Sequence, residues 1–151
     1  MIGPDDWEEF RDVRLASLLD APAAFGARHA DWAGADEQRW RDRMSSVPLT
    51  VVARSSDGAV GVVCGAEAED SVELISMWVA PEHRGTGLAD RLVAEVVTWA
   101  RGRGKPTGLD VRDENAAAIR AYERAGFVDH GVPDDRPDDA PRERRMWHGR
   151  S

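Results

Sequence analysis

The chain has 151 residues, of which 42% are hydrophobic, and carries a formal net charge of −8 at pH 7. This length and apolar content fit one globular domain over residues 1–151, with a core that needs neither disulfides nor metals. The acidic balance argues against nonspecific nucleic-acid binding, which depends on clustered Lys and Arg.

The remaining bulk features predict a soluble, cytoplasmic protein without membrane contact. No stretch of the sequence approaches the run of about 18 to 20 apolar residues that spans a membrane, and the first ten residues do not resemble a secretion signal. Cys64 is the single cysteine. We interpret it as a buried structural thiol, because no cationic residue adjoins it in the sequence.

The N-terminal part predicts two helices. Residues 4–19 bring Trp7, Phe10 and Leu18 to one side at helical spacing, after a Pro-Asp-Asp start that suits a helix N-terminus. Residues 36–44 predict a second helix, in which Trp40 shares a face with a methionine.

The rest of the chain alternates strands and helices. Three antiparallel strands are expected first, because a Ser-Asp-Gly turn and a short polar turn separate three apolar runs. A helix, a strand, a second helix and two final strands follow. The expected strands are 49–55, 59–68, 72–80, 107–111, 127–130 and 144–148, and the helices are 88–100 and 115–126. This order predicts an α/β or α+β fold with a mixed sheet flanked by helices.

A glycine-containing loop joins the third strand to the central helix. It reads Arg84-Gly85-Thr86-Gly87-Leu88-Ala89. The first turn of a helix leaves backbone N–H groups unpaired, and glycines let an anion approach them closely, so the loop suits a phosphate group. Its residue pattern does not match the P-loop or the dinucleotide-binding fingerprint, so both are excluded. Alone, the loop is equally well explained as a tight turn.

Two motifs together resemble the GNAT superfamily of N-acetyltransferases. The first is [QR]-x-x-G-x-[GA], matched by Arg84, Gly87 and Ala89, and the second is N-x-x-A-x-x-x-Y-x-x-x-G-F, which begins at Asn115 and ends at Phe127. The resemblance covers residues 49 to 128. It implies a mostly antiparallel mixed sheet that binds acetyl-CoA as acyl donor, without a metal. Members also begin with a strand, which is missing or truncated here.

The resemblance implies a set of cofactor-binding residues. The pyrophosphate would bind the backbone of residues 84–89, and the pantetheine would lie along Met77, Trp78 and Val79. The Val79 N–H would be the oxyanion donor. Asn115 and Ala118 belong to the second motif, in which Asn115 would contact the pantetheine.

Tyr122 and Glu73 are the candidate acid and base. A phenol is neutral at pH 7, since its pKa is about 10, and it can hydrogen-bond or protonate a departing thiolate. The alternative is that Tyr122 only packs. Glu73 would share a strand face with Ile75, Met77 and Val79 and take the proton of the amine. A solvated carboxylate at the sheet edge, or deprotonation by water, remains open as an alternative.

The expected function is acetyl transfer to a primary amine of a small cationic molecule, directly within a ternary complex. Eight carboxylates motivate the cationic acceptor: Asp5, Asp6, Glu8, Glu9, Asp134, Asp135, Asp138 and Asp139. They could equally be solvated surface charges. Two other functions stay open, namely acetylation of protein N-termini or lysines, and a non-catalytic CoA-binding module. A homodimer and a monomer are both compatible with the sequence.

Overall fold

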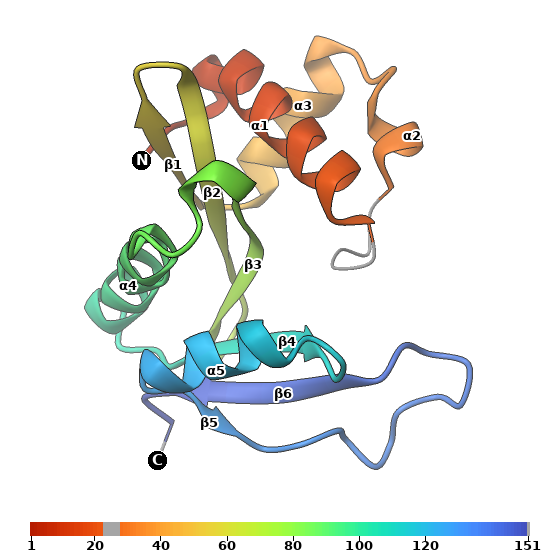
Figure 1. Ribbon diagram of the computed structural model, residues 1–151, viewed down its shortest axis with the longest axis vertical. Helices are drawn as coiled ribbons and strands as arrows, with labels where there is room; N and C mark the ends of the chain where they lie inside the picture. Colours follow the sequence, from red (N-terminus) through yellow and green to blue (C-terminus); the bar gives the residue numbers. More distant parts are fainter. Residues whose placement is uncertain (23–27, 151) are drawn as a thin grey trace.

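The computed structural model describes residues 1–22 and 28–150, which form a mixed sheet with helices on both faces (Figure 1). The six strands lie in the order β1-β2-β3-β4-β6-β5. Their bounds are β1 (Leu49–Ser55), β2 (Gly58–Glu67), β3 (Val72–Val79), β4 (Thr107–Arg112), β5 (Val128–Asp129) and β6 (Glu143–His148). All neighbouring strands are antiparallel except β3 and β4. The predicted mixed, mostly antiparallel sheet is confirmed.

The helices agree with the predicted ones to within a few residues. They are α1 (Trp7–Asp20), α2 (His29–Trp32), α3 (Glu37–Ser46), α4 (Leu88–Gly102) and α5 (Ala116–Arg124), with short 3-10 turns η1 (Pro4–Asp6) and η3 (Pro81–His83). The sequence did not predict α2, because four residues are too few for a helical period. No described helix has both the length and the hydrophobicity to cross a bilayer.

Two hydrophobic cores lie on opposite faces of the sheet. On one face, α4 and α5 cover side chains such as Val63, Val72 and Leu109. On the other, Phe10 of α1 and Trp40 of α3 pack edge to face, with ring centroids 5.9 Å apart, and both side chains are fully buried. Figure 1 shows α1 and α3 beside β2, with α2 farther out beyond α1, and all three lie away from α5, which runs along β4 and β6.

The chain ahead of α1 runs beside the sheet edge without forming a strand. The Ile2 N–H donates to the Thr50 carbonyl of β1 at 2.9 Å, and η1 follows directly. As predicted, no strand precedes α1 in residues 1–22. The first residues of the chain therefore lie against the β1 edge of the sheet.

Candidate functional site

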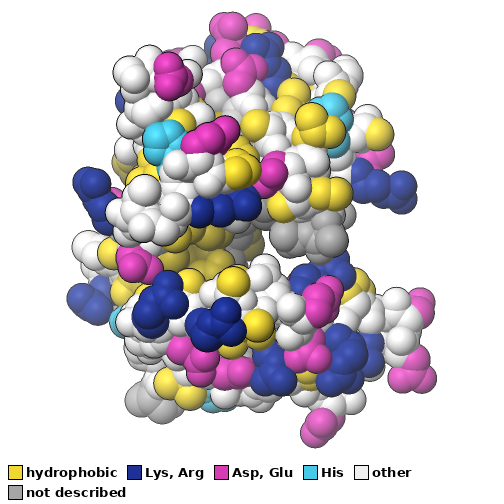
Figure 2. Space-filling model, viewed as in Figure 1, with side chains coloured by type: hydrophobic (Ala, Val, Ile, Leu, Met, Phe, Trp, Pro, Cys, Tyr) yellow, Lys and Arg dark blue, Asp and Glu magenta, His cyan; other side chains and the backbone are white. Residues whose placement is uncertain are grey.

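A cleft opens where β3 and β4 separate. Their parallel pairing covers only Val72 with Thr107 and Glu73 with Gly108, near the start of both strands. Beyond these pairs, residues 74–79 of β3 and 110–112 of β4 line a cleft of about 860 Å³. In Figure 2 this cleft is a groove across the molecule, with apolar side chains in its floor and basic side chains on both lips. Separated strands expose backbone that a ligand can pair with.

A β-bulge in β3 sets which side chains face each side of the sheet. Trp78 lies opposite Val62, and Ile75 lies opposite Cys64. Between these two pairs, β3 has two residues whereas β2 has one, so β3 contains one extra residue. Ser76 at the bulge has φ 58°, a left-handed conformation that is unfavourable for residues other than glycine. Such strained positions persist where the surrounding structure holds them in place.

The bulge corrects the predicted face of the strand. Glu73, Ile75, Met77 and Val79 were expected on one face, because a regular strand alternates with a period of two. Instead, Ile75 packs in the core under α1 and α3, whereas Met77 and Val79 pack in the core under α4. The extra residue of β3 reverses the alternation within the strand, and the sequence carries no signal for it.

One end of the cleft is the loop end, formed by Arg84, Gly85, Ala89 and Asp90. Gly85 and Gly87 have φ of 77° and 83°, and a Cβ built on either would meet no atom within 4 Å. Gly87 is the N-cap of α4, and the first intrahelical bond runs from the Arg91 N–H to its carbonyl. The backbone N–H groups of residues 88–90 therefore lie ahead of the helical hydrogen-bond ladder, where they can bind an anion.

Not every residue of the predicted loop faces the cleft. Thr86 donates its hydroxyl to the His83 carbonyl, and Leu88 packs between the two cores. Neither these two side chains nor Gly87 is among the residues that line the cleft in the described part of the chain. These residues instead help to hold the loop in its conformation.

Arg84 is held by the protein itself. Its Nε donates to the Val79 carbonyl at 3.1 Å, and its Nη2 donates to Asp20 Oδ2 at 2.7 Å. Trp78 Nε1 donates to the same Asp20 oxygen at 2.9 Å. Hydrogen bonds from Trp78 and Arg84 hold the pKa of the Asp20 carboxyl below its usual value. The end of α1, the end of β3 and the glycine loop are thus tied together at one carboxylate.

The predicted residues of α5 line the same cleft. Asn115 is the N-cap of α5, and its Oδ1 accepts from the Ala118 N–H at 3.2 Å. The Tyr122 ring packs edge to face on Phe127, with centroids 5.7 Å apart. Burial raises the pKa of Tyr122 to about 12. The structure therefore brings Asn115, Ala118 and a neutral phenol to the same cleft as the loop end.

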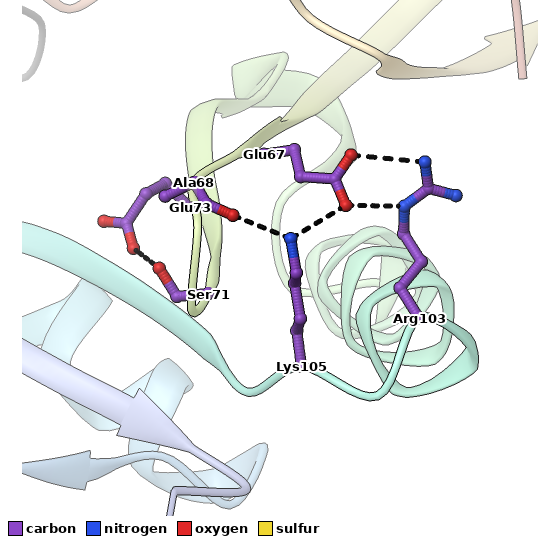
Figure 3. A network of polar contacts seen from close by, with 6 residues as sticks. All are labelled: Glu67, Ala68, Ser71, Glu73, Arg103 and Lys105. Carbon is purple, nitrogen blue, oxygen red and sulfur yellow. Dashed lines mark hydrogen bonds and ion pairs between the residues drawn. The ribbon is translucent and has the colours of Figure 1, made fainter.

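Glu73 lines the cleft, but it is engaged in hydrogen bonds. Arg145 donates to both carboxylate oxygens at 2.6 and 2.8 Å, and the Ser71 hydroxyl donates at 2.9 Å; Figure 3 shows the contact with Ser71. Desolvation alone would raise the pKa of Glu73, but the bonds from Arg145 and Ser71 outweigh it and lower the pKa. Its side chain is 27% exposed, on a strand inside the sheet. Glu73 is thus not at the edge of the sheet, and only part of its carboxylate is open to solvent.

The opposite face of the cleft holds residues that the sequence did not single out. Arg14 of α1, Arg43 of α3 and Ser76 at the bulge all line it, and we call them the arginine end. A signal existed for Arg14, which follows Phe10 and precedes Leu18 at intervals of four on a buried helix face. Cys64 is buried as predicted, but Arg43 Nη2 lies 4.0 Å from its Sγ. Tertiary structure thus places a cation beside this thiol.

Solved structures of acetyltransferases share this architecture. A GNAT acetyltransferase from Streptococcus pneumoniae superposes with a TM-score of 0.76 at 18% identity, covering 97% of this chain and 93% of that one. An acetyltransferase from Salmonella typhimurium, solved with acetyl-CoA, gives a TM-score of 0.69 at 20% identity over 97% of this chain and 88% of that one. At these identities the likeness shows the fold.

The sequence comparisons show the family. The model of the acetyltransferase (GNAT) family matches residues 7–127. The chain therefore belongs to the GNAT acetyltransferase family, as its two motifs predicted. The streptothricin acetyltransferase of Streptomyces lavendulae is 44% identical over 55 residues, which make up 36% of this chain and 29% of that protein. This match spans less than a third of that relative.

Proposed function

We propose that the protein is an acetyl-CoA-dependent N-acetyltransferase that transfers the acetyl group directly to a primary amine. The observation that carries this proposal is the cleft between β3 and β4, which joins an open glycine loop at a helix N-terminus to a partly buried, neutral phenol. Family membership and the acetyl-CoA bound to the Salmonella typhimurium acetyltransferase support acetyl-CoA as the donor.

The residues of the cleft fit the donor in two parts. The pyrophosphate would bind the backbone N–H groups of the glycine loop, where open space at Gly85 and Gly87 allows close approach. The pantetheine would lie along Met77, Trp78 and Val79, whose strand has no β4 partner at this point. Asn115 and Ala118 would border it from the start of α5.

The proposed reaction forms one C–N bond and breaks one C–S bond. The amine nitrogen attacks the thioester carbonyl carbon, and the Val79 N–H donates to the oxygen on which charge develops. Tyr122 donates a hydrogen bond to the departing sulfur. Its raised pKa keeps the donor proton in place at physiological pH. The proton that the amine loses reaches the thiolate through solvent, so that an amide and a thiol leave.

Glu73 is the proposed acceptor of the amine proton, through a water molecule. Its bonds to Arg145 and Ser71 favour the charged form, so it is a weak base that stays ionised. Water alone as the acceptor of the proton is the competing proposal. The two differ in how much activity depends on the Glu73 carboxylate.

The predicted cationic acceptor rested on eight carboxylates near the two ends of the chain. None of the eight lines the cleft in the described part of the chain, and two of them, Asp5 and Glu9, pair with Arg41 and Arg54. A cationic acceptor therefore stays a prediction that these residues do not support.

A thiol-release assay tests the proposed function. Acetyl-CoA would be offered with small amines, amino acids, polyamines and peptides, and we expect thiol release with a small amine. Release confined to peptides would favour protein acetylation. Binding of acetyl-CoA by calorimetry, with no release across the panel, would overturn the enzyme and favour a CoA-binding module.

A further inference from the structure

The arginine end lies on the face of the sheet opposite α4 and α5. Arg14 and Arg43 project from α1 and α3, which cover one face, whereas Tyr122 and Ala118 pack in the core on the other. The cleft passes between β3 and β4 and reaches both faces. If acetyl-CoA fills the loop end, as proposed above, the arginine end is where the second substrate enters.

Arg43 presents a donor that the described part of the chain does not use. Its Nη2 donates to the Ser76 hydroxyl at 3.2 Å, and its guanidinium carbon lies 5.3 Å from the centre of the Phe10 ring. Its Nη1 is buried and has no hydrogen-bond partner among the described residues. A buried donor on a charged group is unfavourable unless it is satisfied. An anion in the cleft would satisfy it.

Arg14 adds a second positive charge to the same wall. Its side chain is more than nine-tenths buried, with 8% exposed, and its Nη1 donates to Ser17 Oγ at 3.4 Å. Burial, followed by the nearby charge of Arg43, lowers the pKa of Arg14 to about 10, so the group stays cationic near neutral pH. Two guanidinium groups of like charge repel each other, and a bound anion relieves that repulsion.

The bulge in β3 contributes to the same wall. Ser76 keeps its left-handed backbone and holds the Arg43 guanidinium through its hydroxyl. This contact fixes the direction of the Arg43 fork relative to β3, along which the acetyl group is proposed to lie. An ordered guanidinium loses less conformational entropy when it binds a ligand than a free one does.

We propose that Arg14 and Arg43 form an anion subsite, so that the amine acceptor carries a compact oxyanion, either a carboxylate or a phosphate. This inference rests on the proposed acetyl transfer and names its substrate class. A substrate such as an amino acid would place its anion between the two guanidinium groups and its amine toward β3. Planar guanidinium groups bind both oxyanions through paired N–H donors.

Matched acceptors test the substrate class. Amino acids, their amides and aminoalkyl phosphates would be compared by kcat/KM in the thiol-release assay. Losing one partner of a buried charge pair weakens binding by about 30-fold or more, so we expect at least that preference for an anionic acceptor over its amide. The carboxylate and phosphate arms distinguish the two oxyanions. Equal kcat/KM for acids and amides in the wild type would overturn the inference.

Substitutions test whether Arg43 is responsible for the preference for an anionic acceptor. Arg43→Gln should abolish the preference for the anionic acceptor and leave the KM for acetyl-CoA unchanged, and Arg43→Lys should keep part of it. Arg41→Gln is the matched control, because Arg41 lies on the same helix, pairs with Asp5 and Glu37, and does not line the cleft. An unchanged preference in Arg43→Gln would overturn the assignment.

Anion binding can be measured without turnover. At constant ionic strength, acetate or inorganic phosphate in place of chloride should raise the Tm of the wild type and of Arg41→Gln more than that of Arg43→Gln, in which phosphate can still bind the glycine loop. If no amine releases thiol and this pattern holds, the proposed function fails and the anion subsite stands. If neither anion raises the Tm of the wild type, the subsite is wrong even for an active enzyme.

Discussion

The two ends of the cleft are built in different ways. The loop end consists mainly of backbone, held in place by two glycines with positive φ and by the first turn of α4, within a few consecutive residues. The arginine end consists of side chains from α1, α3 and β3, which are separated by about thirty residues each along the chain. A backbone site suits a group common to many substrates, whereas a side-chain site can change with the acceptor.

The largest expected effect is a loss of acetyl-CoA affinity when the loop end is changed. Gly87→Val should weaken acetyl-CoA binding by about 10- to 150-fold, because losing one hydrogen bond to a charged group removes about 1.5–3 kcal/mol. Calorimetry with acetyl-CoA measures it. The positive φ of Gly87 also strains a valine, so some loss of stability is expected whatever the ligand.

A second glycine separates strain from binding. Gly104, beyond the other end of α4, has φ 71° and equally open surroundings. Gly104→Val should lower the Tm by a similar amount and leave the affinity for acetyl-CoA unchanged. Equal losses of affinity in both variants would show that folding, and not phosphate contact, explains the effect at Gly87.

Tyr122 lines the cleft but belongs to neither of the two ends, so its substitution should change neither binding step. Tyr122→Phe should lower kcat by about 10- to 100-fold, because general-acid groups contribute roughly that much or more and water substitutes in part. Steady-state kinetics with both substrates checks this. The KM for acetyl-CoA should stay within about twofold, because the ring and its contact with Phe127 remain. A fully active variant would leave Tyr122 a packing residue.

A smaller effect is expected at Glu73. Glu73→Gln should lower kcat/KM less than tenfold, because a carboxylate with a lowered pKa is a weak base. Between pH 6 and 9, kcat/KM should rise with pH in wild type and variant alike, following the amine of the acceptor, while Glu73 stays ionised throughout. A pH profile that flattens only in the variant would make Glu73 the dominant base.

The smallest effect concerns neither end of the cleft. Glu67 accepts hydrogen bonds from Arg103 at 2.9 Å and from Lys105 at 3.0 Å, tying β2 to the turn after α4 (Figure 3). These bonds lower its pKa from 4.5 to about 2. A lowered pKa in the folded state stabilises the protein above pH 4.5, and that stabilisation is lost as the pH falls toward 2.

Glu67→Gln should therefore lower the Tm by a few degrees at most at pH 7, since exposed ion pairs contribute little. The difference from the wild type should shrink as the pH falls toward 2, and KM should be unchanged for both substrates. A constant difference in Tm at every pH would mean that the charge of Glu67 is not what stabilises this corner.

The same comparison of the two ends of the cleft explains which features could be predicted from the sequence. Residues 84–89 and 115–127 carry local signals, because a strand, a glycine turn and a helix start must follow one another directly to make a phosphate-binding loop. The strands and α4 were predicted closely for a similar reason, since hydrophobic periodicity is written along each element. Family and fold could thus be predicted before any coordinate was known.

Tertiary structure decided the rest, because it depends on groups that are distant in sequence. The bulge at Ser76 appears only when β3 is paired with β2, and it divides a strand that alternates regularly in sequence. Arg14 and Arg43 become neighbours of each other and of Cys64 only when α1 and α3 pack on the sheet. The two positive charges repel each other, and burial disfavours the charged form of a guanidinium group. No local sequence pattern therefore predicts that the two arginines lie together. Only the packing of α1 and α3 on the sheet brings these two charged side chains together at this end of the cleft.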